Sequence, residues 1–151
     1  TPVHSPRLAS PPRQPQDLAN HTLAEEDAQL TTSRAAQWRA WLKAQGLPAL
    51  QPRGWLLLNF THQQVQAALA GQAVALARLP LVAESLANGD LIEPLPQMRL
   101  DSPLVYWLVV APRSVVRPEV KAFCDWLLRE AERTRQPLGE VPDPDTVDHI
   151  D

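Results

Sequence analysis

Residues 54–64, GWLLLNFTHQQ, hold the pattern that decides the fold of this chain. Gly54 opens an apolar run of strand length, and Thr61 is followed three residues later by Gln64, the spacing of a helical capping box. The segment therefore predicts a strand that passes directly into a helix, with Thr61 as its cap and Ala70 near its end.

The same order of elements extends outward in both directions. Apolar runs predict further strands, and stretches with helical spacing, Pro starts and Gly stops predict helices. This alternation predicts an α/β domain with a largely parallel sheet flanked by helices. The runs WLLL and LVYWLVV predict strands that are covered on both faces. The expected strands are 21–26, 73–77, 91–95 and 104–111, and the expected helices are 15–20, 35–45, 80–88 and 118–135, the last one stopped by Pro137.

Length and composition restrict the class of protein. The chain has 151 residues, 44% of them hydrophobic and 21% charged, as in one ordinary globular domain. The net charge of −3 argues against a basic surface for nucleic acid. Residues 137–151 hold five acidic and no basic residues, so they are interpreted as a flexible acidic tail. No stretch is long and apolar enough for a membrane span or an export signal, so a cytoplasmic location is expected.

Signatures of catalysis or metal binding do not emerge from the residue spacing. The four histidines are scattered, and neither a phosphate-binding loop nor a G-x-S-x-G motif occurs. The single cysteine, Cys124, falls in the apolar part of the last helix and is interpreted as an inert buried thiol. The run Glu25–Asp27 is interpreted as a solvated loop. The sequence therefore predicts no enzyme, no metal and no cofactor.

One segment has the character of a binding site. In open α/β sheets, ligands bind beyond the carboxyl ends of the strands, and a helix that starts there offers free N–H groups. Asn59, Thr61 and His62 would add side-chain donors, and Phe60 would form an apolar wall. The alternative interpretation is a purely structural helix start.

Seven segments in a fixed order resemble a known family: PVHSPRL, PQDLANHTL, WRAWLKAQG, LNFTHQQVQAALAGQAVALA, LVAESLANGDLIEPL, YWLVVAP and VKAFCDWLLREA. Over residues 2–132 they resemble the C-terminal half of LysR-type transcriptional regulators, in the branch of the glycine-cleavage activator and the β-lactamase regulators. The resemblance implies two lobes like those of periplasmic binding proteins. It places a crossing segment and linker in 1–19, the second lobe in 20–96, and a return strand and helix of an incomplete first lobe in 97–136.

The resemblance also implies a ligand site between the lobes. The family's positions after the strand match Asn59, Phe60 and Thr61, with His62 at the edge. A position on the returning strand matches Tyr106, for which packing in the sheet is the alternative. The crossing segment matches Val3, Ser5 and Pro6, of which Ser5 is the candidate contact. One departure is Ala73, where relatives commonly have Gly, because it adds a Cβ at a close strand–helix approach.

Three functions remain open from the sequence. The leading hypothesis is the sensing module of a DNA-binding regulator. Its effector would be a small molecule, for which an anion is one candidate. DNA contact would come only through a segment absent here, and the expected assembly is a homodimer or homotetramer. The alternatives are a fragment of a solute-binding protein and an enzyme on the same scaffold. With most of the first lobe absent, the apolar faces that carry Trp107, Val109, Phe123 and Leu127 are expected to be partly exposed.

Overall fold

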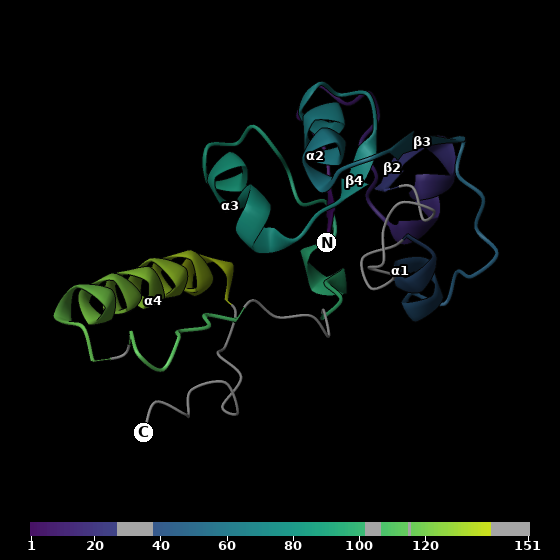
Figure 1. Ribbon diagram of the computed structural model, residues 1–151. Helices are drawn as coiled ribbons and strands as arrows, with labels where there is room; N and C mark the ends of the chain where they lie inside the picture. The colour runs from purple at the N-terminus through teal and green to yellow at the C-terminus, as the bar shows by residue number, and fades with distance from the viewer. Residues whose placement is uncertain (27–37, 102–106, 115, 140–151) are drawn as a thin grey trace. The chain divides into compact units, whose positions relative to one another are not determined.

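The computed structural model describes residues 1–26, 38–101, 107–114 and 116–139. The chain divides into two compact units, Thr1–Leu104 and Val105–Asp151, and each is described by itself. The first unit holds the sheet and the candidate site (Figure 1).

A four-stranded mixed sheet forms the centre of the first unit. Its strands are β1 (Pro2–Val3), β2 (Thr22–Glu26), β3 (Gly54–Leu58) and β4 (Val74–Leu76). They lie in the order β1-β4-β2-β3. β2 is parallel to both β3 and β4, and β1 is antiparallel to β4. The expected mixed, mostly parallel sheet flanked by helices is therefore confirmed.

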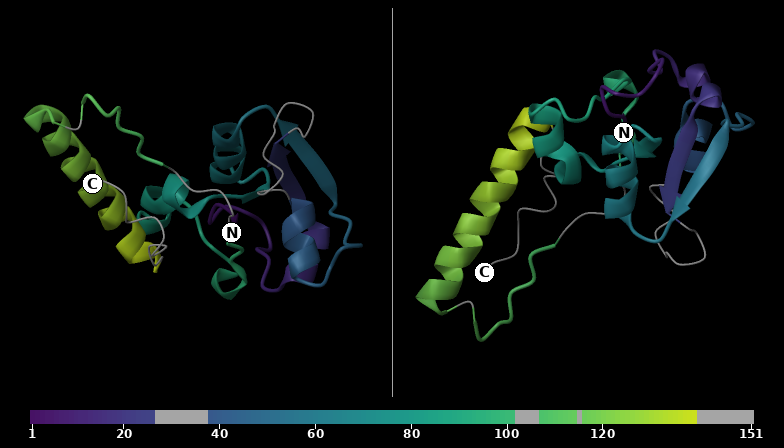
Figure 2. Two further views of the ribbon diagram at one scale, coloured as in Figure 1. Left: turned by 60° about the horizontal axis from the view of Figure 1, so that its bottom comes forward. Right: turned by 90° about the horizontal axis from the view of Figure 1, so that it is seen from above.

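Two hydrophobic clusters pack on the two faces of this sheet. Successive side chains of a strand point to opposite faces, so Leu23 belongs to one cluster and Ala24 to the other. On the first face lie the 3₁₀ helix η1 (Pro15–Asn20) and α1 (Trp38–Ala44). On the second lie α2 (Thr61–Leu69) and α3 (Leu79–Ala87), and Figure 2 shows α1 and α2 on opposite sides of the strands.

β3 differs from the expectation of a strand covered on both faces. Among the residues that the structure describes, it pairs only with β2, so it is an edge strand. Its register with Leu23 places Trp55 on the face of α1, but Trp55 and Leu57 keep 44% and 59% of their surface exposed. The apolar run WLLL therefore belongs to an edge strand with one uncovered face and not to a central strand.

The predicted helices of the first unit are confirmed where the structure describes them, with one shift. Residues 35–37 of the predicted helix 35–45 lie outside the described residues. Helix α2 begins at Thr61, but its N-cap is Phe60, one residue before the expected cap. The second side chain of the capping box is therefore Gln63 in place of Gln64. Its Oε1 accepts the N–H groups of Asn59 and Phe60 at 3.1 and 3.3 Å. Gly71 ends the helix with φ +72°, a left-handed conformation that favours glycine.

Two of the predicted strands are wrong in the part of the chain that the structure describes. The segment 91–95 makes only an isolated bridge, in which Ile92 pairs with His4. Its partner β1 ends at Val3, so a ladder has no second pair to extend into. In the predicted strand 104–111, residues 107–111 form no strand, and 104–106 lie outside the described residues.

The short 3₁₀ helix η3 (Pro96–Met98) is the last helix of the first unit. The described part of the second unit contains one long helix. This helix, α4, spans Pro118–Leu138, whereas it was expected to stop before Pro137. The first two residues of the expected tail, 137–151, therefore belong to the helix, and 140–151 lie outside the described residues. Proline at this point removes one N–H bond of the last turn, and the helix ends at Gly139, which has φ +69°. Cys124 is buried as expected, and Phe123, Trp107 and Val109 are exposed, with Leu127 half-buried.

Candidate functional site

The strand-to-helix corner, residues 59–62, lies where β3 ends and α2 begins. Because β2, β3 and β4 are parallel, their carboxyl ends share one edge of the sheet, and the corner stands at that edge beside Glu26, the last residue of β2. Three of its side chains are exposed and Thr61 is half-buried. The corner is therefore open to a ligand, and it is not sealed inside the domain.

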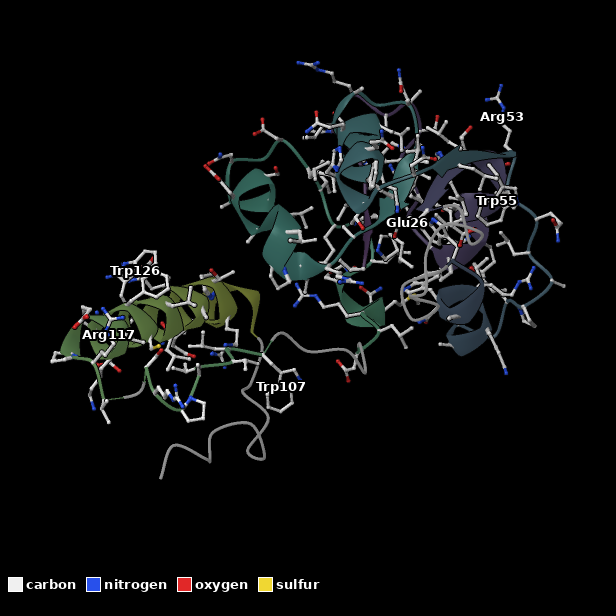
Figure 3. The ribbon with its side chains drawn as sticks, in the orientation of Figure 1. Glu26, Arg53, Trp55, Trp107, Arg117 and Trp126 are labelled. Carbon is white, nitrogen blue, oxygen red and sulfur yellow. The ribbon has the colours of Figure 1, made fainter. Side chains whose placement is uncertain are left out.

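Thr61 connects the corner to the end of β2. Its hydroxyl donates to Glu26 Oε2 at 3.4 Å. Glu26 pairs in register with Leu58, so both side chains point to the face that α2 covers. A carboxylate therefore lies at the N-terminus of α2, where the positive end of the helix dipole stabilises it. Figure 3 labels Glu26 at this position.

Glu25 occupies the same edge on the opposite face. Its Oε1 accepts the backbone N–H of Trp38 at 2.9 Å, at the start of α1. Burial raises the pKa of the Glu25 carboxyl, and the Trp38 N–H acts in the opposite direction. The interpretation of Glu25 and Glu26 as a solvated loop is wrong, because both end a paired strand and each meets a helix; Asp27 lies outside the described residues.

Phe60 and His62 form a stacked aromatic pair at the corner. Their ring centroids are 5.6 Å apart and the planes differ by 14°. Phe60 is 57% exposed and His62 is exposed as well. The pair therefore presents a flat apolar surface to solvent.

A groove continues from the corner along the junction of β3 and α2. Its volume is about 600 Å³, and its floor includes Leu56 and Leu58 from β3. The opposite wall comes from α2 and the turn after it and is rich in amide side chains: His62, Gln63, Gln66, Ala67, Ala70 and Gln72. The groove lies on the face opposite to Trp55 and Leu57, so the edge strand is apolar on both sides.

One of the predicted site residues that the structure describes, Ser5, is not brought to the corner. β1 runs antiparallel to β4, so the chain after Val3 travels toward the amino ends of the parallel strands. Ser5 follows there, only 2% exposed, with its Oγ accepting the N–H of Arg7 at 3.2 Å. It lines a separate hollow of about 310 Å³, together with Pro6, Arg7, Leu69, Gly89 and Asp90. Tyr106 lies outside the described residues.

Ala73, the departure from the family's glycine, is accommodated in the core. It is 1% exposed and belongs to the cluster on the face of α2 and α3. Its methyl group therefore adds buried apolar surface just before β4.

Within the described ranges, no three His, Cys, Asp or Glu side chains lie close enough to hold a metal ion. No helix in this part of the chain has the length and apolar character that a membrane span requires. The features of the corner are hydrogen-bonding groups, a carboxylate and an aromatic surface, which can bind a small molecule.

The sequence reasoning missed Glu26 and Gln63 as members of the corner. Glu26 is part of an acidic run, so the sequence did not distinguish it from its neighbours. Only the parallel register of β2 and β3 brings it to Thr61. Gln63 lies one residue before Gln64, the residue that was expected to complete the capping box. The sequence therefore indicated a capping box but placed it one residue too late.

The comparisons with known proteins give one family and several relatives. The family model described as LysR substrate binding domain matches residues 1–132. The HTH-type transcriptional regulator TrpI of Pseudomonas aeruginosa is 35% identical over 126 residues, which cover 83% of this chain and 41% of that protein. The glycine cleavage system transcriptional activator of Escherichia coli is 28% identical over 133 residues, which cover 86% of this chain and 41% of that protein.

Solved structures agree with these relatives. The effector domain of the transcriptional regulator AmpR of Pseudomonas aeruginosa superposes with a TM-score of 0.62 at 29% identity, over 91% of this chain and 64% of that one. The AmpR effector binding domain from Citrobacter freundii, at 19% identity and a TM-score of 0.57, supports the fold alone. The chain spans about two fifths of the length of the curated relatives that it matches.

Proposed function

The chain belongs to the LysR substrate binding domain family, and we propose that it is the effector-sensing part of a transcriptional regulator and performs no catalysis. The observation that carries this proposal is the family match over residues 1–132 together with a corner that stays open at the carboxyl edge of the sheet. DNA contact would come from a segment outside this chain, which agrees with the net charge of −3.

The division of the chain follows from the same proposal. Residues 1–19 would be the crossing segment and linker, 20–96 the second lobe, and 97–136 the return of the chain to the first lobe, followed by an acidic tail. The exposed apolar side chains of the second unit support this arrangement, since Trp107 and Trp126 are 67% and 48% exposed (Figure 3). Surfaces of this kind are typical of faces that another element covers.

The effector would bind at the corner, with Asn59, Phe60, Thr61 and His62 as its contacts from the second lobe. Tyr106 stays in the proposal as a contact from the returning segment. Ser5 is left out of the proposed contacts, because it is only 2% exposed and follows β1 toward the amino end of β4.

The carboxylate of Glu26 argues against a negative charge on the effector. A free helix N-terminus favours an anion, but the α2 N-terminus already has a carboxylate beside Thr61. An anionic effector would meet this carboxylate in the same space. A neutral group that accepts hydrogen bonds from the first turn of α2 suits the corner better than a full negative charge does.

A second copy of this chain is the proposed macromolecular partner, and its contact would be the β3 edge. Edge strands with unpaired backbone groups and apolar side chains favour pairing with another chain. Trp55 and Leu57 on one side and the groove on the other supply such a surface. As a DNA-binding regulator, the complete protein would act in the cytoplasm.

A ligand screen followed by NMR tests the proposal. A library of metabolites is screened by thermal shift on the complete regulator, and each hit is then titrated into this chain labelled with ¹⁵N. Hits are expected to shift the amide signals of residues 59–63. Asn59→Ala should weaken the binding of these hits. Gln45→Ala, in the turn after α1, is the control and should leave their binding unchanged. Hits that shift only amides around Ser5 and Asp90 would contradict the site.

A further inference from the structure

Phe60 occupies a position where its side chain is unfavourable for helix stability. It is the N-cap of α2, with extended backbone angles of φ −141° and ψ 146° and no cap bond from its own side chain. Ser, Thr, Asn and Asp are strongly preferred at this position, because their side chains accept a first-turn N–H. Gln63 supplies the other arm of the cap, since its Oε1 accepts the N–H groups of Asn59 and Phe60. The helix start is therefore maintained around a residue that contributes neither a cap nor a buried side chain.

The ring of Phe60 is also stacked against a second ring. The imidazole of His62 stacks against it, at a centroid distance of 5.6 Å and an angle of 14°. One face of the phenyl ring is thus supported, while 57% of the side chain remains exposed. A rigid flat surface of this kind loses little conformational entropy when a second ring stacks on it.

Polar groups surround this aromatic surface. Thr61 follows Phe60 in the sequence, and its hydroxyl donates to the Glu26 carboxylate at 3.4 Å. The first turn of α2 also has N–H groups without partners inside the helix. A ligand above Phe60 therefore meets an aromatic face and hydrogen-bonding groups at the same time.

We propose that the effector carries a planar aromatic ring that stacks on Phe60, with Phe60 as the specificity-determining residue and His62 as the residue that positions it. This inference rests on the proposed function, because it names the ligand chemistry of the same corner. The ring would carry a neutral polar substituent that accepts hydrogen bonds from the start of α2.

A pair of neutral amides tests the inference on this chain. Benzamide and cyclohexanecarboxamide have the same polar group and similar size, but only benzamide has a flat aromatic ring. Each is titrated into the ¹⁵N-labelled chain while the amides of residues 59–63 are followed. Benzamide is expected to bind about two- to tenfold more tightly, the range for aromatic stacking in proteins. Phe60→Leu keeps an apolar side chain and should bring the ratio to about one, whereas Phe60→Tyr should retain it.

The control is Leu81→Ala, which removes an apolar side chain that is 52% exposed on α3, away from the corner. It should leave the benzamide preference unchanged. Equal binding of the two amides, binding of neither, or a preference that persists in Phe60→Leu would overturn the inference. A saturated effector that shifts residues 59–63 in the library screen would also overturn it, but would leave the proposed function standing.

Discussion

At the scale of the residue, the corner depends on a few side chains with distinct tasks. Gln63 closes the start of α2, Thr61 reaches Glu26, and Phe60 is left exposed. The expectation that Thr61 caps the helix is wrong by one position, because the chain leaves β3 through the extended Phe60 and enters the helix only at Thr61. The capping contribution therefore belongs to Gln63.

Replacing Gln63 is expected to destabilise the domain. Gln63→Ala removes the acceptor of two backbone N–H groups and should lower the free energy of unfolding by about 0.5–1.5 kcal/mol. Urea unfolding measured by circular dichroism checks this. Gln66→Ala, a change of the same kind at an exposed position of α2, is the control and should cost less. Equal losses of unfolding free energy in the two variants would contradict the capping role of Gln63.

The buried His21 predicts that the first unit loses stability in acid. The pKa of His21 is lowered, mainly by burial and then by the nearby His4, while Asp17 and the Ser10 carbonyl act in the opposite direction. A proton therefore binds more readily to the unfolded chain. Stability should be constant at higher pH and fall as the pH decreases below about 6.5, the ordinary value for histidine. Melting temperatures between pH 8 and 5 check this, and His21→Gln should flatten the curve.

At the scale of the element, short turns position the site. Gly71 ends α2 and lets the chain enter β4 three residues later, so that β4 lies beside β2. In the Schellman arrangement that results, Gln72 N–H donates to the Ala67 carbonyl at 3.0 Å and Gly71 N–H to the Ala68 carbonyl at 2.9 Å. The placement of the corner at the edge of the sheet follows from this tight return.

Gly71→Ala is expected to destabilise the first unit through backbone strain. A Cβ at this position would meet Arg7 Cβ at 3.5 Å, an ordinary contact, so the cost is conformational. For an L-residue in the left-handed region this amounts to about 1–2 kcal/mol. Gly54→Ala is the matched control, because its φ lies outside that region and its nearest contact is 3.8 Å. A loss in Gly71→Ala no larger than in the control would contradict this account.

At the scale of the whole molecule, each compact unit leaves large apolar side chains uncovered. In the first unit they include Trp55 and Leu57 on β3, and in the second they include Trp107, Phe123 and Trp126, the last two in ring contact at 5.7 Å. The expectation that Trp107, Val109 and Phe123 would be exposed is confirmed. Exposure in both units predicts that the chain associates with a partner, and we assign the β3 edge to a second copy.

Leu57→Lys is expected to prevent this association. The side chain is 59% exposed on the edge strand, so a lysine can be accommodated without disturbing the core. Light scattering coupled to size exclusion should give a dimer for the parent chain and a monomer for the variant. Leu81→Lys, at a residue 52% exposed on α3, should remain a dimer. A parent chain that is monomeric at high concentration would argue against the β3 contact.

The sequence by itself determined the local elements, the alternation of strands and helices, the family and the position of the corner. These features depend on periodicity, Gly and Pro placement and side-chain chemistry within a few residues, which a sequence displays directly. The tertiary structure decided which residues share the corner. Glu26 meets Thr61 only through the parallel register of β2 and β3, and Ser5 is separated from it only because β1 runs antiparallel. Register and strand direction depend on contacts between distant segments, so local patterns do not specify them.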